Sequence, residues 1–359
     1  MKIFLLAGEE SGALYARQIR CEIEASHPTA EFRGYADYGF KIEDLAVMGV
    51  GRVLLKLPYF LRVRRTMERA ILEWRPDLVC TVDYPGMNLR LAAFAKAHGI
   101  RTVHVVCPQV WAWKKGRIPK IEAALDKLCC FFPFEPKLFK LGFAEFVGHP
   151  LVDEMQDLAA KGHKESAENV LAVLPGSRIG EIEKHMPMLL KVCTVLQHEI
   201  PHLKVVIPAA NDRAHAVLQS HTKACAIQVV KGGAREVLES ADAAVVASGT
   251  ATLEAALAGC PTVLVYRVGW LFAFLARLLI KGIRHVGLIN IVAEKAHREC
   301  PMPELLQENF TVDRTVQLLR PWLTDATANT AARQALTETI ALLKSNGRAI
   351  HRIAQIVTE

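Results

Sequence analysis

The sequence predicts an α/β protein with two Rossmann-like, doubly wound parallel-sheet domains that face each other across a cleft. Three observations support this prediction. Short apolar segments alternate with helical segments from residue 2 to residue 135, a second series of the same kind begins at residue 169, and a polar stretch separates the two. Repeated alternation of strand and helix is typical of parallel sheets covered by helices on both faces. A chain of 359 residues is long enough for two such domains.

In the first series, short apolar runs rich in branched residues predict the strands, and longer runs with apolar residues on one side predict the helices. The predicted strands are residues 2–8, 77–86, 101–108 and 126–135. The predicted helices are residues 12–26 and 88–98, the second ending at Gly99. These elements form the expected N-terminal domain over residues 1–160.

The second series follows the polar stretch QDLAAKGHKESAEN, residues 156–169. Its predicted strands are residues 169–178, 203–209, 226–230 and 243–247, and its first predicted helix is residues 181–198. We expect the C-terminal, nucleotide-sugar-binding domain over residues 161–325. Residues 326–359 are helical in pattern and are predicted to pack back on the first domain.

Charge and composition narrow the classes of partner. The formal net charge is +7 at pH 7, which suits nucleic acid, an anionic membrane or a phosphorylated substrate. No run of five like charges occurs, and no basic segment is interleaved with aromatic residues, so nucleic acid is not an expected partner. The nine cysteines include no CxxC pair, which predicts buried reduced thiols and no metal site.

Two apolar stretches bear on membranes. Residues 268–283 are interrupted by Arg277 and ended by Lys281, short of the roughly 20 residues that a membrane span requires. Residues 270–284 and residues 53–65 both combine apolar residues with cations, a pattern typical of helices that lie at a lipid surface. In residues 53–65 we expect a leucine, tyrosine and phenylalanine face, with Leu55, Tyr59 and Phe60, to meet the lipid. Both stretches are also compatible with core helices. The N-terminal apolar run is too short for a signal peptide and predicts a strand, so we expect a cytoplasmic protein.

Two strand–turn–helix segments of the second domain have the composition of phosphate sites. In LPGSRIGE, Gly176 frees the turn, Ser177 can cap the helix, Arg178 offers a guanidinium fork, and Glu181 can orient it. In VVASGTATLE, Ser248 or Thr250 can cap a helix and Gly249 permits close approach of a ligand. Glu254 follows one turn later and can accept hydrogen bonds from sugar hydroxyls. Ordinary capping with a surface ion pair is the alternative interpretation.

The first domain has polar groups at the ends of its predicted strands. The AGEESG turn places Glu9 beside Ser11 in a setting that suits sugar hydroxyls better than phosphate. Asp83, at the end of a strand, can act as a general base or can simply cap its turn. Further along the chain, Gln109 and Trp111 occur in CPQVWAWKKGR and His149 in VGHP. The tryptophan can be a core residue, a sugar platform or an interface anchor, and a histidine before proline is most often structural.

These turns together resemble one family. AGEESG, DLAVMG, VDYPGMN, PQVWAWKKGR, FPFE, FVGHPLVD, LPGSR and ASGTATLEAAL occur in this order between residues 7 and 257. They look like the lipid-A-disaccharide synthases, glycosyltransferase family 19, which have the GT-B fold. The resemblance extends from about residue 2 to residue 309.

The resemblance implies a reaction and a set of site residues. A 2,3-diacylglucosamine would move from UDP to the 6-hydroxyl of 2,3-diacylglucosamine 1-phosphate, with inversion and without a metal or cofactor. Asp83 and Glu9 would be catalytic, and Ser11, Asn88, Gln109, Trp111 and His149 would lie on the acceptor side. Asn290 in GLINIVA would contact the far side of the nucleotide, together with the two phosphate turns.

The resemblance also implies a place in the cell and has one exception. The enzyme would act at the inner face of the bacterial inner membrane, held by anionic lipid, as a monomer or a homodimer. The family usually reads GExSGD where this chain has Ala13 after Gly12, so one carboxylate is missing. Two alternatives stay open, a UDP-GlcNAc 2-epimerase-like enzyme of the same fold and a non-catalytic nucleotide-sugar-binding relative.

Overall fold

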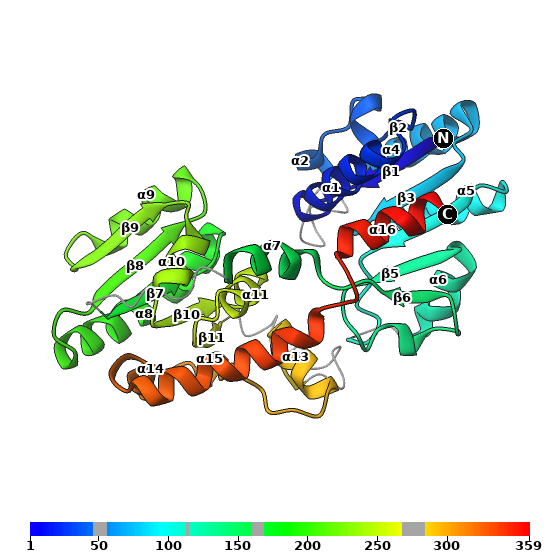
Figure 1. Ribbon diagram of the computed structural model, residues 1–359. Helices are drawn as coiled ribbons and strands as arrows, with labels where there is room; N and C mark the ends of the chain where they lie inside the picture. The colour runs from blue at the N-terminus through cyan, green and yellow to red at the C-terminus, as the bar shows by residue number, and fades with distance from the viewer. Residues whose placement is uncertain (46–55, 113–114, 160–168, 268–283) are drawn as a thin grey trace. The chain divides into compact units, whose positions relative to one another are not determined.

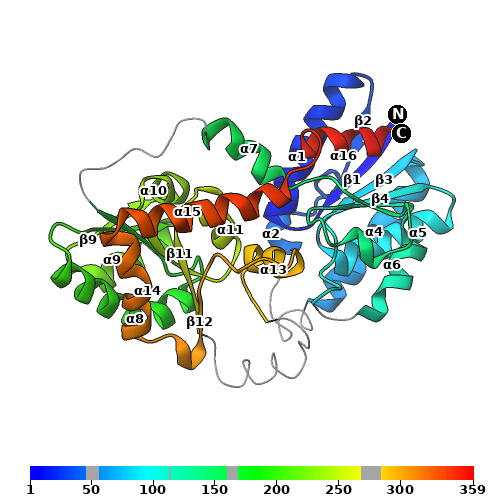
Figure 2. The ribbon, with the colours of Figure 1, turned by 60° about the horizontal axis from the view of Figure 1, so that its bottom comes forward.

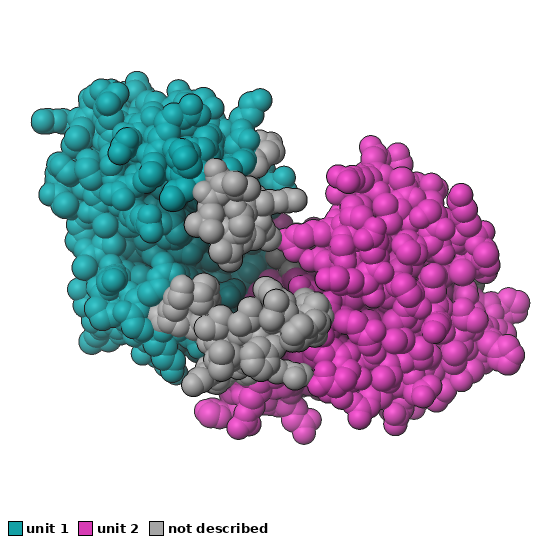
Figure 3. Space-filling view, turned by 180° about the vertical axis from the view of Figure 1, so that it is seen from behind, with its two compact units in different colours: residues 1–153, 343–359 teal, residues 154–342 magenta. Residues whose placement is uncertain are grey.

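The computed structural model describes residues 1–45, 56–112, 115–159, 169–267 and 284–359. The chain forms two compact units, shown in different colours in Figure 3. Unit 1 comprises Met1–Asp153 and Leu343–Glu359, and unit 2 comprises Glu154–Leu342. Each unit is built on its own six-stranded parallel sheet with helices packed on it (Figure 1). The predicted pair of Rossmann-like parallel-sheet domains is therefore confirmed.

The sheet of unit 1 has the strand order β2-β1-β3-β4-β5-β6. Its strands are β1 (Lys2–Ala7), β2 (Glu31–Arg33), β3 (Leu78–Val82), β4 (Arg101–Val105), β5 (Lys127–Cys130) and β6 (Ala144–Phe146). Every neighbouring pair is parallel, so the carboxyl ends of these strands lie along one edge of the sheet. The predicted strand at residues 126–135 ends at Cys130, before the FPFE turn.

Helices cover both faces of this sheet, and successive residues of a strand contact opposite layers because their side chains alternate between the faces. Ile3 packs with residues of α1 and α16, whereas Phe4 packs with residues of α4 and α5. The helical elements of unit 1 are α1 (Glu10–Ser26), η1 (Tyr35–Tyr38), α2 (Ile42–Leu45), α4 (Leu57–Trp74), α5 (Pro85–Ala97), η2 (Lys115–Arg117), α6 (Ile118–Ala124), η3 (Pro136–Leu138) and α16 (Ala349–Thr358). Helix α7 (Pro150–Ala159) and the short η5 (Ala341–Leu343) lie where the chain leaves and re-enters this unit.

The last helix, α16, completes unit 1. It lies beside α1 (Figure 1), and Ile353 and Ile356 are buried in the core together with Ile19 and Ile23 of α1. The Arg352 guanidinium binds the carboxylate of Glu145 at the end of the same sheet. Of the C-terminal segment expected to pack back on the first domain, only the part from Leu343 onward belongs to unit 1.

The sheet of unit 2 has the strand order β12-β11-β10-β7-β8-β9. Its strands are β7 (Val170–Leu174), β8 (Lys204–Ala209), β9 (Ile227–Lys231), β10 (Ala243–Ala247), β11 (Thr262–Tyr266) and β12 (Glu304–Leu306). Its helical elements are α8 (Ile179–Glu199), α9 (Asp212–Thr222), α10 (Ala234–Ser240), α11 (Thr250–Leu257), α13 (Leu288–Lys295), η4 (Gln307–Asn309), α14 (Val312–Thr324) and α15 (Ala326–Ile340). Helices α8 and α14 pack side by side over one face of the sheet (Figure 2).

Within the residues that the structure describes, no helix is both long enough and apolar enough to cross a bilayer. The apolar stretch at residues 268–283 lies outside the described residues. The cysteines do not all follow the prediction, because Cys21 is exposed and Cys225 and Cys300 are half-buried.

Candidate active site

In unit 1, the pairing of β1 with β3 brings the two predicted catalytic carboxylates into one region. Ala7, the last residue of β1, is paired with Val82, so the turns that carry Glu9 and Asp83 leave the sheet side by side. Burial raises the pKa of Glu9, and the charge of Asp83 raises this pKa further. The two carboxylates are therefore close enough for the Asp83 charge to favour protonation of Glu9.

Asp83 is held in an uncommon backbone conformation. Asp83 and Tyr84 have φ angles of 51° and 52°, in the left-handed region that few non-glycine residues occupy. The Asp83 N–H donates to the carbonyl of Val105 at 2.9 Å, and the carboxylate accepts the Tyr84 N–H at 2.8 Å. Burial raises the pKa of Asp83, against the opposing effect of this hydrogen bond. A strained turn that presents a buried carboxylate is a common feature of functional sites.

Tyr84, which the sequence did not single out, packs against the turn that carries Glu9. Its hydroxyl donates to the carbonyl of Leu45 at 3.1 Å. A Cβ atom at position 8 would lie 2.2 Å from the Tyr84 ring, so only glycine permits this approach. The GEE turn therefore depends on Gly8 for its packing against Tyr84.

Asn88 is buried and positions the two strand ends. Its side-chain Nδ2 donates to the carbonyls of Leu6, Val82 and Asp83, the last at 2.7 Å. Its Oδ1 accepts the Tyr35 hydroxyl at 2.8 Å. Because the amide is fully used inside the protein, Asn88 positions Asp83, and the predicted contact with the acceptor is not available to it.

The remaining predicted acceptor-side residues divide into buried and exposed groups. Trp111 is a core residue, whose indole N–H donates to Glu135 at 3.1 Å. His149 is also buried, and its Nδ1 accepts the N–H of Leu151 at 3.3 Å. Burial lowers the pKa of His149 to about 4, so the imidazole is neutral at pH 7. The structure does not support a direct acceptor contact for Trp111 or His149, whereas Ser11 and Gln109 are exposed.

Glu135 is a buried carboxyl that the sequence did not single out. Besides Trp111, it accepts the N–H of Phe132 at 3.2 Å. The sulfur atoms of Cys107 and Cys130 and a Glu135 oxygen all lie within 4.8 Å of one another. Burial raises the pKa of Glu135 to about 8. Glu135 thus fixes the FPFE turn against the tryptophan loop.

In unit 2, the pairing of β7 with β10 brings the two predicted phosphate turns together. Leu174 is paired with Val246, so residues 175–178 and 248–249 leave the sheet at neighbouring positions. Helix α8 begins at Ile179 after the first turn, and α11 begins at Thr250 after the second. Two helix N-termini at one sheet edge form a favourable site for an anion.

The helix caps differ from the predicted ones. The N-cap of α8 is Arg178 and that of α11 is Gly249, so neither Ser177 nor Ser248 caps its helix. The Arg178 N–H donates to the Glu181 carboxylate at 3.4 Å. Gly249 has no side chain, so no N-cap side chain accepts a hydrogen bond from the N-terminal N–H groups of α11. The side chain of Thr250 lies outside the described residues.

The first turn is organised by Glu181. Its carboxylate binds the exposed Arg178 guanidinium at 2.7 Å, as the sequence predicted. Gly176 has a φ angle of 116°, and a Cβ atom there would lie 2.6 Å from a Glu181 carboxylate oxygen. Glycine is therefore required at this position for Glu181 to close over the turn and orient Arg178.

Glu254 and Asn290 have different surroundings. Glu254 is half-buried on α11, and burial raises its pKa against the opposing charge of Arg235. Asn290 has no exposed surface, and its amide bonds Met302 at 2.6 Å and Glu304 at 2.8 Å. Asn290 is thus occupied by internal hydrogen bonds next to β12, so the predicted contact with the nucleotide is not available in this structure.

His185 is a positioning residue that the sequence analysis missed. Its Nδ1 lies 2.8 Å from the carbonyl of Pro175, and its Nε2 accepts the N–H of Arg267 at 3.1 Å. These contacts require a neutral imidazole with the proton on Nδ1. His185 therefore links the turn after β7 to the end of β11. Its place three residues after buried Ile182, on the apolar face of α8, is the only sequence signal for this role.

Comparison with known proteins agrees with this geometry. The family model described as Lipid-A-disaccharide synthetase matches residues 3–357. The chain is 36% identical over 348 residues to the lipid-A-disaccharide synthase of Chromohalobacter salexigens, covering 91% of this chain and 89% of that protein. It is 34% identical over 375 residues to the corresponding protein of Anaeromyxobacter sp. strain K, covering 99% of this chain and 96% of that protein.

Solved structures support the fold class alone. The MnaA–UDP complex of S. aureus aligns with a TM-score of 0.65 and 13% identity over 100% of this chain and 98% of that one. The glycotransferase of kitacinnamycin aligns with a TM-score of 0.62 and 13% identity, covering 99% and 98% of the two chains. The GT-B type predicted from the sequence is thus confirmed.

Proposed function

Because this chain belongs to the lipid-A-disaccharide synthetase family, we propose that it transfers 2,3-diacylglucosamine from UDP to the 6-hydroxyl of 2,3-diacylglucosamine 1-phosphate. The products are UDP and the β-1′,6-linked disaccharide 1-phosphate. The observation that carries this proposal is the pair of half-buried carboxylates at the sheet edge of unit 1, Asp83 and Glu9. A buried carboxylate with a raised pKa is suited to take a proton from a hydroxyl.

The reaction is a single displacement with inversion at the anomeric carbon. Asp83 accepts the proton of the acceptor 6-hydroxyl while this oxygen forms a bond to the anomeric carbon. The bond from that carbon to the β-phosphate oxygen breaks, and its electron pair leaves with UDP. Burial raises the pKa of Asp83 as the base, and Glu9 in the neighbouring turn can accept a hydrogen bond from a sugar hydroxyl.

Unit 2 supplies the groups suited to the nucleotide. The N-termini of α8 and α11 and the Arg178 guanidinium would bind the diphosphate and stabilise the charge that develops on the leaving group. Glu254, half-buried on α11, would accept hydrogen bonds from ribose hydroxyls. Gly176 and Glu181 hold Arg178 in place for this role.

We also propose that helix α4 rests on the membrane that contains both substrates. Its buried side faces the core with Val63, Met67 and Ile71, and Leu57 and Leu61 on its other side are 48% and 43% exposed. Arg62, Arg65 and Arg69 line a hollow of about 370 Å³ next to Leu61. Exposed leucines beside arginines suit an anionic lipid surface. Tyr59 and Phe60, expected on this face, are instead half-buried against the core, and Leu55 lies outside the described residues.

A transfer assay with radiolabelled donor tests the proposed reaction. Purified protein, UDP-2,3-diacylglucosamine and the acceptor should yield labelled disaccharide and stoichiometric UDP in detergent. Release of UDP without any acceptor, together with conversion of UDP-GlcNAc to its 2-epimer, would instead support the epimerase alternative. The family match favours the transferase.

A further inference from the structure

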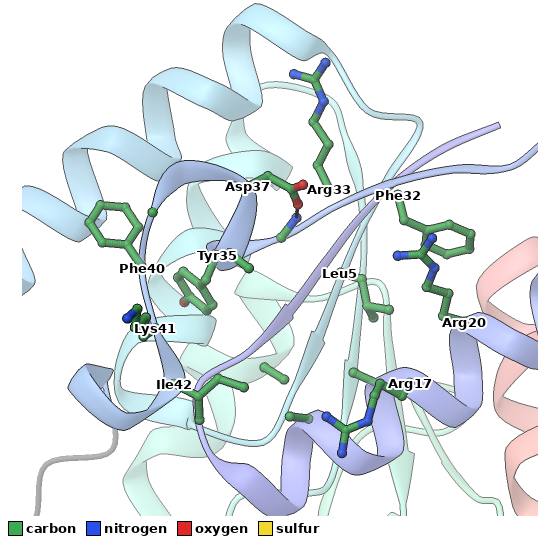
Figure 4. A pocket seen from close by; sticks show the side chains of 16 residues that line it. Leu5, Arg17, Arg20, Phe32, Arg33, Tyr35, Asp37, Phe40, Lys41 and Ile42 are labelled. Atoms are coloured by element: carbon green, nitrogen blue, oxygen red, sulfur yellow. Dashed lines mark hydrogen bonds between the residues drawn. The ribbon is translucent and has the colours of Figure 1, made fainter.

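A pocket of about 740 Å³ lies in unit 1 between β1, β2, the first turns of α1 and the segment that follows β2 (Figure 4). Much of its lining is apolar, from Leu5, Ala7, Ala13, Ala16, Phe32 and Phe40. None of the residues assigned to the reaction above lines this pocket. Its size and apolar walls are in the range of ligand sites in proteins.

The pocket also carries an excess of positive charge. Four cations line it, namely Arg17, Arg20, Arg33 and Lys41, against one carboxylate, Asp37. The Asp37 carboxylate accepts the N–H of Gly34 at 2.7 Å and so stabilises its own turn. Such an excess of cations in a concave surface attracts an anionic ligand.

The four cations are not equally available. Arg20 pairs with Glu24 at 2.7 Å, and the Arg33 guanidinium lies over the Trp74 ring at 4.8 Å. Arg17 and Lys41, by contrast, have no carboxylate partner among the residues that the structure describes, and both are exposed. Figure 4 shows the Arg17 side chain extending along the pocket from α1, with Lys41 on the segment across from it.

The pocket begins next to the catalytic carboxylates. A Cβ atom at position 12 would lie 3.4 Å from Cβ of Asp83 and 3.7 Å from Cβ of Ala7. Ala7 and Ala13 both line the pocket, and Gly12 between them in sequence is buried. The pocket therefore lies next to the contact of Gly12 with Asp83.

We propose that this pocket binds the phosphate monoester and the adjoining acyl carbons of the acceptor, with Arg17 and Lys41 as the phosphate-binding residues. This inference rests on the proposed function, in which the acceptor is an acylated sugar 1-phosphate. The apolar walls suit the first methylene groups of an acyl chain, and the two exposed cations suit the phosphate oxygens. The pocket thus selects an acceptor that is both acylated and phosphorylated.

The test compares two acceptors that differ only in the 1-phosphate, 2,3-diacylglucosamine 1-phosphate and 2,3-diacylglucosamine. The ratio of their kcat/KM values is measured for wild type, Arg17→Ala and Lys41→Ala. Each change should lower this ratio by about ten- to a hundredfold, mainly through KM for the phosphorylated acceptor. Arg90→Ala, which removes an exposed arginine of the same unit outside the pocket, should leave the ratio unchanged.

Competition identifies the source of the anion. Inorganic phosphate and glucosamine 1-phosphate should inhibit wild type and should lose potency against Arg17→Ala, whereas binding to phosphatidylglycerol vesicles should be the same in both. If the vesicle binding falls and the acceptor ratio does not, the pocket binds a lipid headgroup and the proposal is wrong. Equal loss of activity toward both acceptors also overturns it. Absence of transfer to either acceptor by wild type refutes the proposed function instead.

Discussion

Replacement of Asp83 by asparagine tests the base most directly, because the structure permits this change without a change of shape. The amide oxygen of the new side chain can keep the contact with the Tyr84 N–H, which is 2.8 Å in the native protein. Asparagine also tolerates the left-handed conformation that this residue adopts at a φ of 51°. The substitution therefore removes the proton acceptor and leaves the turn in place.

We expect kcat to fall by about 10²–10⁴, which is the usual contribution of a general base and corresponds to roughly 3–5 kcal/mol of activation free energy. Binding of UDP should be unchanged, since the groups assigned to the nucleotide lie in unit 2. The melting temperature should not fall. Burial raises the pKa of Asp83, so an ionised carboxylate is disfavoured in the folded state and a neutral amide is not.

The assay is the initial rate of disaccharide formation at saturating substrates, with UDP affinity measured by calorimetry. Asp83→Ala is the companion variant, because alanine at a positive φ adds about 1–2 kcal/mol of backbone strain and should lower stability as well as rate. If Asp83→Asn turns over like wild type, another group takes the proton and the role of Asp83 is wrong.

Four further predictions follow from the same geometry. Glu9→Gln should leave the acid limb of the kcat–pH profile in place, since burial and not Glu9 raises the pKa of Asp83. A limb that moves to lower pH would show that the Glu9 charge also acts on Asp83. Arg178→Ala should weaken UDP binding and slow transfer together. Lysine should rescue both poorly, because an ammonium group cannot form the two parallel hydrogen bonds of a guanidinium. Unchanged affinity in a UDP titration would exclude a role of Arg178 in diphosphate binding. Burial raises the pKa of Glu135 to about 8 in the folded state from about 4.5 in the unfolded state, so its contribution to stability decreases as pH rises between these values. Glu135→Gln should remove a decrease of about 1.4 kcal/mol per pH unit in the free energy of unfolding. Denaturant titrations from pH 5.5 to 7.5 would contradict this prediction if wild type and variant showed the same pH dependence. The double variant Leu57→Glu, Leu61→Glu should sediment less with anionic vesicles and should keep the melting temperature of wild type. Phe60→Glu changes a half-buried residue and should lower the melting temperature. If the double variant bound vesicles like wild type, α4 would not be the membrane contact.

The fold was predictable from the sequence because its signals are local. Each buried strand is a short apolar run, and turns with glycine, proline or serine mark the strand ends. Parallel pairing then places the ends of β1 and β3 together, and likewise those of β7 and β10. The regions around Asp83 and Arg178 could therefore be located without coordinates.

The roles of individual polar residues were less predictable, because they depend on contacts between distant parts of the chain. Asn88 bonds Leu6, 82 residues away, and His185 bonds the backbone of Arg267, also 82 residues away. Nothing in the neighbouring sequence distinguishes a polar side chain that bonds a remote carbonyl from one that meets a ligand. The exposed face of α4 was misplaced for a related reason, since the packing of Phe60 depends on Phe40 and Tyr59.

Hydrogen-bond donors distinguish the structural carboxylates from the functional ones. Glu135 is buried, but it receives the Trp111 indole N–H and the Phe132 N–H, so its oxygens are occupied within the protein. Asp83 receives one backbone N–H, and among the described residues the carboxylates of Glu9 and Glu254 receive none. Glu9 and Glu254 are half-buried, so their oxygens remain accessible to donors from outside the protein. Sugar hydroxyls are such donors, and Glu9 and Glu254 lie in the units where the acceptor and the nucleotide are proposed to bind. A carboxylate whose oxygens the fold leaves without donors is therefore better suited to a polyhydroxylated substrate than one that the fold already satisfies.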